Sequence, residues 1–502
     1  MKPARTLEAG LFLALFFGYF LISGGQAPKG DAYAPFVGAI QLVKGEGILE
    51  SKVMPGQMFL IAPIALTTRA VLGALDDDPH RWVAMILLSN VFPALVTAAT
   101  AVLVLRVARL IGHGECAALA ASLLFALATP AAVYAKSFFP QPTEAFFLLA
   151  CVWGLLVARG AADATATRPL VLSGLAYGAL LLVKAVAVAY LPVLAAFLLT
   201  LRRDGRGARR LATWAGPALA LALFYLPYNA AARGSPLDFG YGEGRDALWG
   251  FATSTLVGLW GLLLSPGKGF FFYAPVLLLA LPGARRLLAR DRAVALLLVG
   301  LALAPLLLHA HWWAWHGDNA WGPRYLVPVL PVVTLLAVEP LRAFHPRCDA
   351  RTAALAALVA LSGGVQVLGG AFTNDAYQTL TYDAVLPRYR ASDGPRGPRD
   401  DEIHLHAIPE FSPLAGHAWL LGHALRGDAP DAYLADYPWR ALRPDGAWAP
   451  RVPDPPPEID LWLTRLPRVY PSTRGVLAVV ALLAAAGAAF GAILLARSVR
   501  SA

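Results

Sequence analysis

The richest concentration of chemically versatile side chains in the sequence lies between His309 and Tyr325. Its aromatic faces, amides, imidazoles and carboxylate suit sugar rings and hydroxyl groups, and its arginine suits a phosphate. The alternative is an interfacial aromatic belt, because Trp gathers at both surfaces of a membrane. The candidate residues for binding a sugar or an acceptor in this stretch are His316, Asp318, Asn319 and Trp321.

Asp31 is the candidate general base. It follows the first apolar run almost immediately, in a segment that also contains Tyr33. At a membrane surface, where a lipid and a water-soluble substrate meet, a carboxylate can take the proton of an acceptor hydroxyl. Tyr33 is a further candidate for contact with the sugar or the acceptor. The alternative is that Asp31 is an ordinary solvated loop residue.

Lysine is rare in this arginine-rich chain, and its placement suggests a phosphate site. By the topology predicted below, every lysine except Lys2 lies at the outer face. Lys and Arg are usually enriched on the cytoplasmic side instead. Chance in a small set is the other reading. An ammonium group is a compact point charge on a flexible stem, and Lys184 lies within an apolar stretch, where a cation needs water or an anion. We predict that Lys184, Lys268 and Arg324 converge on a donor phosphate, with Lys136 a weaker candidate.

Four shorter motifs have simpler readings. Asp76-Asp77-Asp78 matches D-x-D, but it precedes an apolar run and is read as a helix cap. Gly267-Lys268-Gly269 lacks the remaining positions of a P-loop, and the glycines at 240–244 are read as a turn. His404 and His406 could share one strand face, yet a metal site needs a third ligand that the sequence does not identify.

Composition places most of the chain in lipid. Hydrophobic residues make up 58% and charged residues only 15%, whereas a soluble domain has about a quarter charged. The net charge of +10 comes from Arg clusters between apolar runs, which is typical of cytoplasmic loops rather than of nucleic-acid binding. We therefore expect no nucleic-acid partner.

The apolar runs predict an all-α polytopic membrane protein with about twelve transmembrane helices. Because each loop on one side is basic, we expect both termini in the cytoplasm and a location in the inner membrane. The stretch 169–201 is too long for one span, so we predict two short helices that turn at Lys184. The runs lie near 7–22, 82–105, 115–132, 143–158, 169–183, 185–201, 211–229, 269–284, 292–312, 324–341, 351–371 and 474–496.

Three parts of the chain are expected. Residues 1–372 form the transmembrane core, residues 373–473 a Pro-rich extracytoplasmic segment, and residues 474–502 the last helix and a cytoplasmic tail. The outer loop 23–81 is expected to contain an interfacial helix over 58–75. Asp78-Pro79 predicts the start of the next helix.

The sequence resembles the GT-C superfamily of integral-membrane glycosyltransferases, specifically the group of protein O-mannosyltransferases and the lipid A aminoarabinose transferase. The likeness lies in one helix, a long outer loop with an acidic residue near its start, and a multi-helix core. Two departures are that Ala32 follows Asp31, where mannosyltransferases have Glu, and that 373–473 matches no known accessory domain. Three short motifs complete the likeness, namely Gln141-Pro142-Thr143-Glu144, Ser265-Pro266-Gly267-Lys268-Gly269 and Gly322-Pro323-Arg324-Tyr325-Leu326.

The resemblance implies a sugar donor linked to polyprenyl phosphate, an acceptor that is a glycan, lipid or protein, and inversion at the anomeric carbon. Asp31 would deprotonate the acceptor hydroxyl while cations hold the leaving phosphate. No metal ligand is assigned, and a divalent metal as cofactor is left open. Two alternatives remain, a twelve-helix secondary transporter and a non-catalytic membrane subunit of an envelope-assembly complex. Secondary transporters are built from internal repeats, and the two halves of this sequence do not match each other. The outer loops are also longer than alternating access requires. Both observations make a transporter the less favoured alternative.

Overall fold

The structure is a computed structural model. It describes residues 3–26, 33–45, 55–73, 78–161, 163–200, 207–239, 251, 253–343, 349–373, 376–377, 406–429, 432–433 and 458–500. Several residues singled out from the sequence lie outside these ranges, and they include Asp31, Asp76, Asp77, the 240–244 turn, His404 and most of 373–473.

The described chain is helical throughout and contains no strand. The helices of the first half are α1 (Pro3–Leu21), α2 (Tyr33–Lys44), α3 (Pro55–Gly73), α4 (Asp78–Leu110), α5 (Glu115–Leu127), α6 (Ala131–Tyr134), α7 (Gln141–Gly160), α8 (Asp163–Val183), η2 (Ala185–Tyr190), α9 (Leu191–Thr200), α10 (Gly207–Ala222) and α11 (Tyr225–Arg233). Those of the second half are α13 (Thr255–Leu264), α14 (Phe270–Tyr273), η3 (Pro275–Leu279), α15 (Ala280–Arg290), α16 (Arg292–Ala310), η4 (Arg324–Val329), α17 (Leu330–Val338), η5 (Glu339–Ala343), α18 (Ala350–Ala371), η6 (Pro409–Phe411), α21 (Pro413–Arg426), α23 (Trp462–Val469), η8 (Pro471–Thr473) and α24 (Arg474–Arg500).

Many of these helices suit a bilayer. In the described ranges, eight are long and apolar enough to cross a membrane, and four shorter apolar helices accompany them. Their apolar side chains form one large core that runs from α1 to α18. The prediction of an all-helical, multi-pass membrane protein is confirmed.

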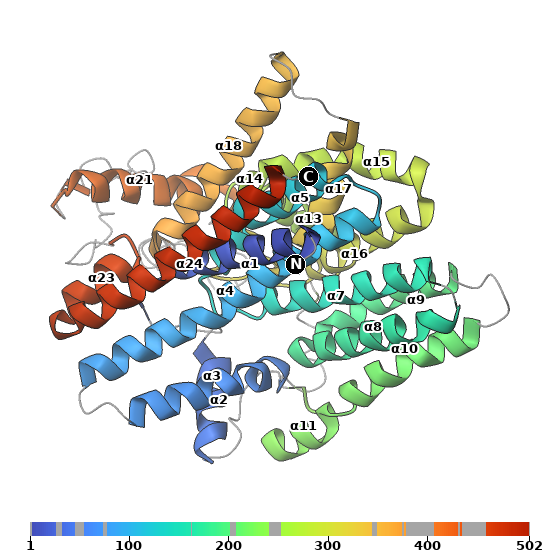
Figure 1. The fold of residues 1–502 in the computed structure, drawn as a ribbon, viewed down its shortest axis with the longest axis horizontal. Coiled ribbons are helices and arrows are strands. Elements are labelled where there is room, and N and C mark those ends of the chain that lie inside the picture. Colours follow the sequence, from blue (N-terminus) through green and yellow to red (C-terminus); the bar gives the residue numbers. More distant parts are fainter. Residues whose placement is uncertain are drawn as a thin grey trace, which may run out of the picture.

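The first and last helices form a close antiparallel pair (Figure 1). A Cβ added to Gly10 would lie 2.6 Å from the backbone nitrogen of Leu495, and one added to Gly487 would lie 2.5 Å from the ring of Phe17. Small residues let helix backbones approach closely where no hydrophobic effect drives their association. The start of α1 and the end of α24 consequently lie at the same end of the bundle.

Charged loops meet at that end of the bundle. Glu8 accepts a hydrogen bond from Arg109 at 2.8 Å. Arg290 binds both carboxylate oxygens of Glu339, at 2.9 and 2.8 Å, and also donates to the carbonyl of Ile111. Among the described residues, the segments after α4, at the end of α15 and after α17 are therefore joined to one another, and the first of them is joined to α1.

The segment between α13 and α16 differs from the prediction. The sequence predicts one span over 269–284, but the structure divides this run into α14, η3 and the start of α15. The break falls at Ala274, which has φ −150° and ψ 70°, because the residue before Pro275 is disfavoured in the helical region. α13 lies in a stretch that the sequence assigned to an outer loop.

Other predicted boundaries agree with the structure. α8 ends at Val183, so the chain between 169 and 201 breaks at Lys184 as expected. α4 begins at Asp78 with Pro79 in its first turn. α3 (Pro55–Gly73) overlaps most of the helix expected over 58–75, and its interfacial position stays a prediction.

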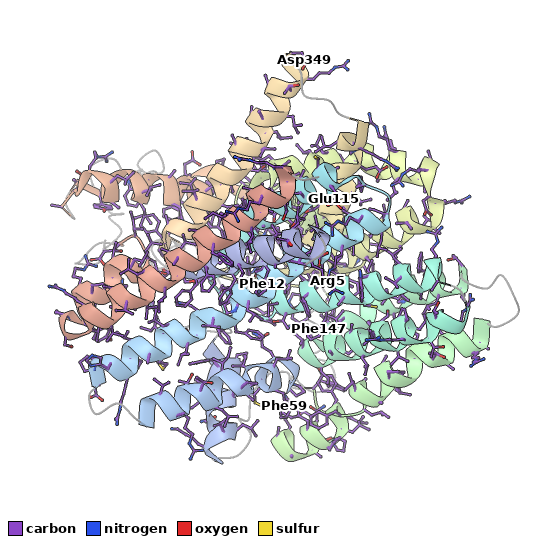
Figure 2. The ribbon with its side chains drawn as sticks, in the orientation of Figure 1. Arg5, Phe12, Phe59, Glu115, Phe147 and Asp349 are labelled. Carbon is purple, nitrogen blue, oxygen red and sulfur yellow. The ribbon has the colours of Figure 1, made fainter. Side chains whose placement is uncertain are left out.

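The segment 406–429 packs against the end of the bundle opposite the chain termini. The backbone N–H of Gly267 donates to the carbonyl of His406 at 3.0 Å, and Ser412 Oγ donates to the carbonyl of Pro266 at 2.6 Å. α21 lies beside the C-terminal part of α18 (Figure 1), whereas Asp349, which caps the start of α18, lies at its protruding tip (Figure 2).

Thiol labelling tests the predicted orientation. In a variant without native cysteines, Leu425→Cys on α21, where Leu425 is 73% exposed, is expected to react with a membrane-impermeant maleimide in intact cells. Ala208→Cys at the start of α10 should react only after the membrane is permeabilised, because it lies between the predicted runs 185–201 and 211–229, in the Arg-rich stretch 202–210 that the topology places in the cytoplasm. The reverse pattern would invert the topology.

Candidate functional site

The candidate site is built around the break in the chain at Lys184. Lys184 is extended, with φ −154° and ψ 110°, so α8 stops and η2 begins on the far side of it. The side chain of Lys184 is half-buried and lines a small pocket. A cation amid apolar helices is costly unless it meets water or an anion, so its surroundings decide what it can do.

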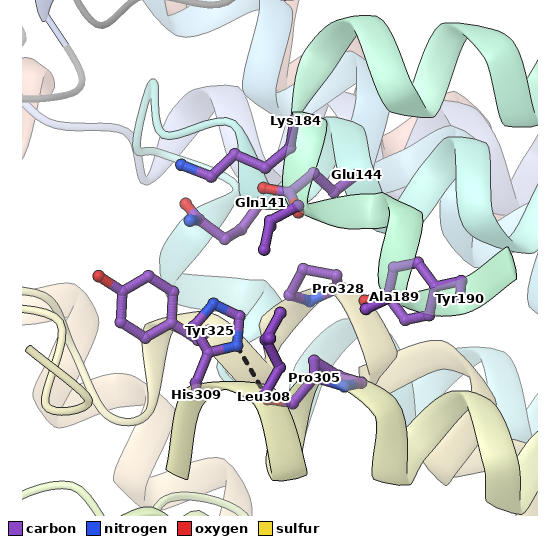
Figure 3. A pocket seen from close by; sticks show the side chains of 11 residues that line it. Gln141, Glu144, Lys184, Ala189, Tyr190, Pro305, Leu308, His309, Tyr325 and Pro328 are labelled. Atoms are coloured by element: carbon purple, nitrogen blue, oxygen red, sulfur yellow. Dashed lines mark hydrogen bonds between the residues drawn. The ribbon is translucent and has the colours of Figure 1, made fainter. Parts of the chain in front are cut away.

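Polar side chains from four elements surround this pocket. Figure 3 shows Lys184 with Gln141 and Glu144 from the first turn of α7 on one side, and His309 and Tyr325 on the other. The His309 ring stacks on Tyr325 at a centroid distance of 4.2 Å. Its Nδ1 is 2.8 Å from the carbonyl of Pro305, which fixes the orientation of the ring.

Arg324 is the second cation of the site. It is 7% exposed, and its guanidinium lies 5.2 Å from the centre of the Phe139 ring. Both Arg324 and Lys184 interact electrostatically with Glu144, and Arg324 also interacts with Lys268. Lys184 and Arg324 thus both act on Glu144, and Arg324 also acts on Lys268, whereas convergence of the three cations on one phosphate stays a prediction.

A large apolar cavity adjoins the pocket. Its volume is about 600 Å³, which is in the usual range for ligand sites. It shares Lys184, Val186, Leu308, His309 and Tyr325 with the polar pocket, and the remainder of its wall is almost entirely apolar. That remainder comes from the end of α8, η2, α10, α11 and the single residues Leu223, Phe239, Phe251 and Trp312. A ligand with a charged head and a long apolar tail would match this shape.

Lys268 lies in the loop between α13 and α14 and is fully buried. Its ammonium donates to the backbone carbonyls of Asp318 and Ala320, both at 2.6 Å. Burial lowers the pKa of Lys268 to about 7, with the Asp318 carboxylate opposing the shift and Arg324 adding to it. These bonds hold the loop that leads into Arg324, so Lys268 fixes the position of that loop.

The residues predicted to bind sugar or acceptor occupy different environments. Asp318 is exposed and has φ 53°, in the left-handed region, and its N–H donates to His316 Nδ1 at 3.1 Å. Asn319 is half-buried. Trp321 is fully buried, 4.8 Å from the His417 ring, so in this structure it packs within the protein.

His316 and His406 form a buried stacked pair, with ring centroids 4.8 Å apart. Burial holds the pKa of His406 well below its ordinary value, and His316 and Lys268 add to this effect. In the described part of the chain, no third His, Cys, Asp or Glu joins them in a group that could hold a metal ion. The pair identifies no metal centre.

Lys136 lies apart from the polar pocket. Its ammonium donates to the carbonyl of Gly370 at 2.6 Å and lies 3.8 Å from the Asp460 carboxylate. Burial lowers its pKa, and Asp460 opposes that shift. Asp460 also accepts from the N–H of Gly25 at 3.0 Å, so Lys136 and Asp460 together join the end of α1 to α18 and the segment before α23.

Asp31, the candidate base, lies outside the described residues, and Tyr33 is the first residue of α2. The site also contains residues that were assigned no role from the sequence, namely Gln141, Glu144, Tyr190, His309 and Tyr325. The motif Gln141-Pro142-Thr143-Glu144, noted above for its resemblance, was the signal in the sequence that pointed to two of them, and a carboxylate beside an apolar run is costly unless it is paired or solvated.

Neither a family model nor a curated protein sequence matches the chain. Among solved structures, the chain is similar to ArnT from Cupriavidus metallidurans bound to undecaprenyl phosphate, with a TM-score of 0.51 and 17% identity over 99% of this chain and 77% of that one. It is also similar to the archaeal oligosaccharyltransferase AglB from Archaeoglobus fulgidus in complex with an inhibitory peptide and a dolichol-phosphate. That match has a TM-score of 0.45 and 14% identity over 82% of this chain and 60% of that one. The fold expected from the sequence is confirmed, and the chain is a multi-pass membrane protein that shares the fold of ArnT.

Proposed function

We propose that this protein is a membrane glycosyltransferase that moves a sugar from a polyprenyl-phosphate donor to an acceptor hydroxyl on the extracytoplasmic face of the inner membrane. The observation that supports this most directly is the apolar cavity of about 600 Å³ that ends at Lys184. Its form matches an isoprenoid chain with a phosphate at one end.

We expect the cavity to open toward the bilayer. Val188, Leu219 and Leu223 line it and are each at least half-exposed, as apolar residues at a lipid-facing opening would be. An isoprenoid chain can therefore enter sideways, without leaving an apolar environment. ArnT, which shares the fold, was solved with undecaprenyl phosphate bound.

The phosphate of the donor is assigned to Lys184 and Arg324. Lys184 lies where the apolar cavity meets the polar pocket, and Arg324 is linked to it through Glu144. Cations placed where negative charge develops stabilise a departing phosphate. Lys268 and Lys136 remain predicted phosphate ligands, although each already donates to backbone carbonyls.

The reaction is a single displacement. The acceptor oxygen attacks the anomeric carbon, the bond from that carbon to the phosphate oxygen breaks, and the phosphate leaves with the electron pair. Asp31 takes the acceptor proton, and the configuration at the anomeric carbon inverts. The acceptor is a glycan, lipid or protein. The candidates for contact with the sugar or the acceptor stay Tyr33, His316, Asp318, Asn319 and Trp321.

Lipid binding tests the proposal. Purified protein in nanodiscs is expected to bind undecaprenyl phosphate at least about tenfold more tightly than undecaprenol, because charge-assisted hydrogen bonds to phosphate contribute about 1.5–3 kcal/mol each. Native mass spectrometry measures both affinities. Equal binding of the two lipids would contradict the proposal, and so would uptake of a soluble solute by proteoliposomes without any sugar transfer.

A further inference from the structure

The first turn of α7 presents two hydrogen-bond acceptors to the polar pocket. Gln141 and Glu144 are three residues apart and so lie on the same face of the helix. They are 2% and 5% exposed, and both line the pocket beside Lys184 (Figure 3). The flanking Pro140 and Pro142 favour the start of a helix at this point, which holds the two side chains in place.

Both residues contain a buried acceptor oxygen that is not satisfied. Among the described residues, Oε1 of Gln141 and Oε1 of Glu144 have no hydrogen-bond partner. A buried polar atom without a partner costs free energy, so this arrangement favours a ligand that brings donors. Lys184 and Arg324 attract an anion to the same place, and such a ligand would therefore have a negative group close to hydroxyl or ammonium hydrogens.

We propose that Gln141 and Glu144 bind the sugar of the donor and determine which sugar is accepted. Their oxygens accept hydrogen bonds from hydroxyl or ammonium groups of the ring, next to the phosphate that Lys184 and Arg324 hold. The inference rests on the proposed function. The adjoining cavity supplies room for the ring, because it meets the pocket at Lys184, His309 and Tyr325.

The test compares lipids that differ only in the sugar. Affinities for undecaprenyl phosphate and for undecaprenyl phosphates bearing a pentose, a hexose or an aminopentose are measured for the wild type, Glu144→Gln and Gln141→Met. Thr143→Val is the matched control. Thr143 lies in the same turn, is equally buried and also has no hydrogen-bond partner among the described residues, but it does not line the pocket.

Glu144→Gln and Gln141→Met are each expected to reduce the preference for the best sugar lipid over the sugar-free lipid by about tenfold. In Glu144→Gln the affinity for sugar-free lipid should stay the same or rise, because a negative charge beside the phosphate is removed. Thr143→Val should keep the wild-type preference. Equal losses for both kinds of lipid, or an unchanged preference, would overturn the inference and leave Glu144 as a counter-ion of the cations. A wild-type protein that binds neither lipid would instead contradict the proposed function.

Discussion

Replacing Asp31 with Asn is expected to lower turnover by about 100-fold or more, the usual contribution of a general base. The amide keeps the size of the carboxylate but cannot accept the proton of the acceptor hydroxyl. Donor binding should persist, because the base acts on the acceptor and the donor is held through its phosphate. The measurement is single-turnover sugar transfer at saturating donor, together with the affinity for undecaprenyl phosphate.

Asp349→Asn is the matched control for this prediction. Asp349 is exposed at the tip of α18, and its carboxylate caps that helix by accepting from the N–H of Thr352 at 2.8 Å. Asn caps a helix about as well as Asp, so this variant should fold and turn over like the wild type. Turnover close to normal in Asp31→Asn would return Asp31 to the role of a solvated loop residue.

The sequence predicted those parts of the site that depend on local chemistry. The break at Lys184 followed from the length of an apolar run and one cation within it, and the structure has α8 end at Val183. The start of α7 at Gln141 likewise follows a recognisable motif. Such features depend only on neighbouring residues and on the thickness of a bilayer. They can therefore be predicted without knowing how the helices pack.

The rest of the site depends on packing between distant segments. The role of Glu144 depends on its electrostatic interaction with Lys184 and Arg324. The role of His309 depends on Tyr325, on which its ring stacks. No pattern in the sequence states which helices will meet. Trp321 illustrates the same limit. Its indole packs against His417, but from the sequence alone it cannot be distinguished from an indole at the membrane surface, where Trp is also frequent.

α13 and the 269–284 run show a different limit. α13 is a 10-residue helix, far shorter than the roughly 20 residues by which spans are recognised, and it was therefore read as part of a loop. The 269–284 run is apolar enough for a span, but Ala274 is not helical, as the following Pro275 favours. Hydropathy reports where a chain can enter lipid and does not report whether its backbone stays regular there.

Lys184→Met is expected to raise the KM for the lipid-linked donor by about 10- to 100-fold, with a smaller effect on the KM for the acceptor. Methionine keeps the length and apolar stem of lysine but removes the ammonium, and charge-assisted hydrogen bonds to a phosphate contribute about 1.5–3 kcal/mol. Steady-state kinetics with donor and acceptor varied separately measure the effect. Lys44→Met is a suitable control, because Lys44 ends α2 and is exposed.

Lys268→Met is predicted to raise the donor KM as well, and it separates two ways in which a lysine can act. The Lys268 ammonium binds the carbonyls of Asp318 and Ala320, so its removal should also lower the melting temperature, whereas Lys184→Met should change the melting temperature little. If Lys268 contacts the phosphate, the variant should lose affinity for undecaprenyl phosphate but not for undecaprenol. Equal losses for both lipids would show that Lys268 acts only by holding the loop before Arg324. Equal rises of the donor and acceptor KM values in Lys184→Met would contradict the assignment of the phosphate to Lys184, because the loss of a contact to the donor is expected to raise mainly the donor KM.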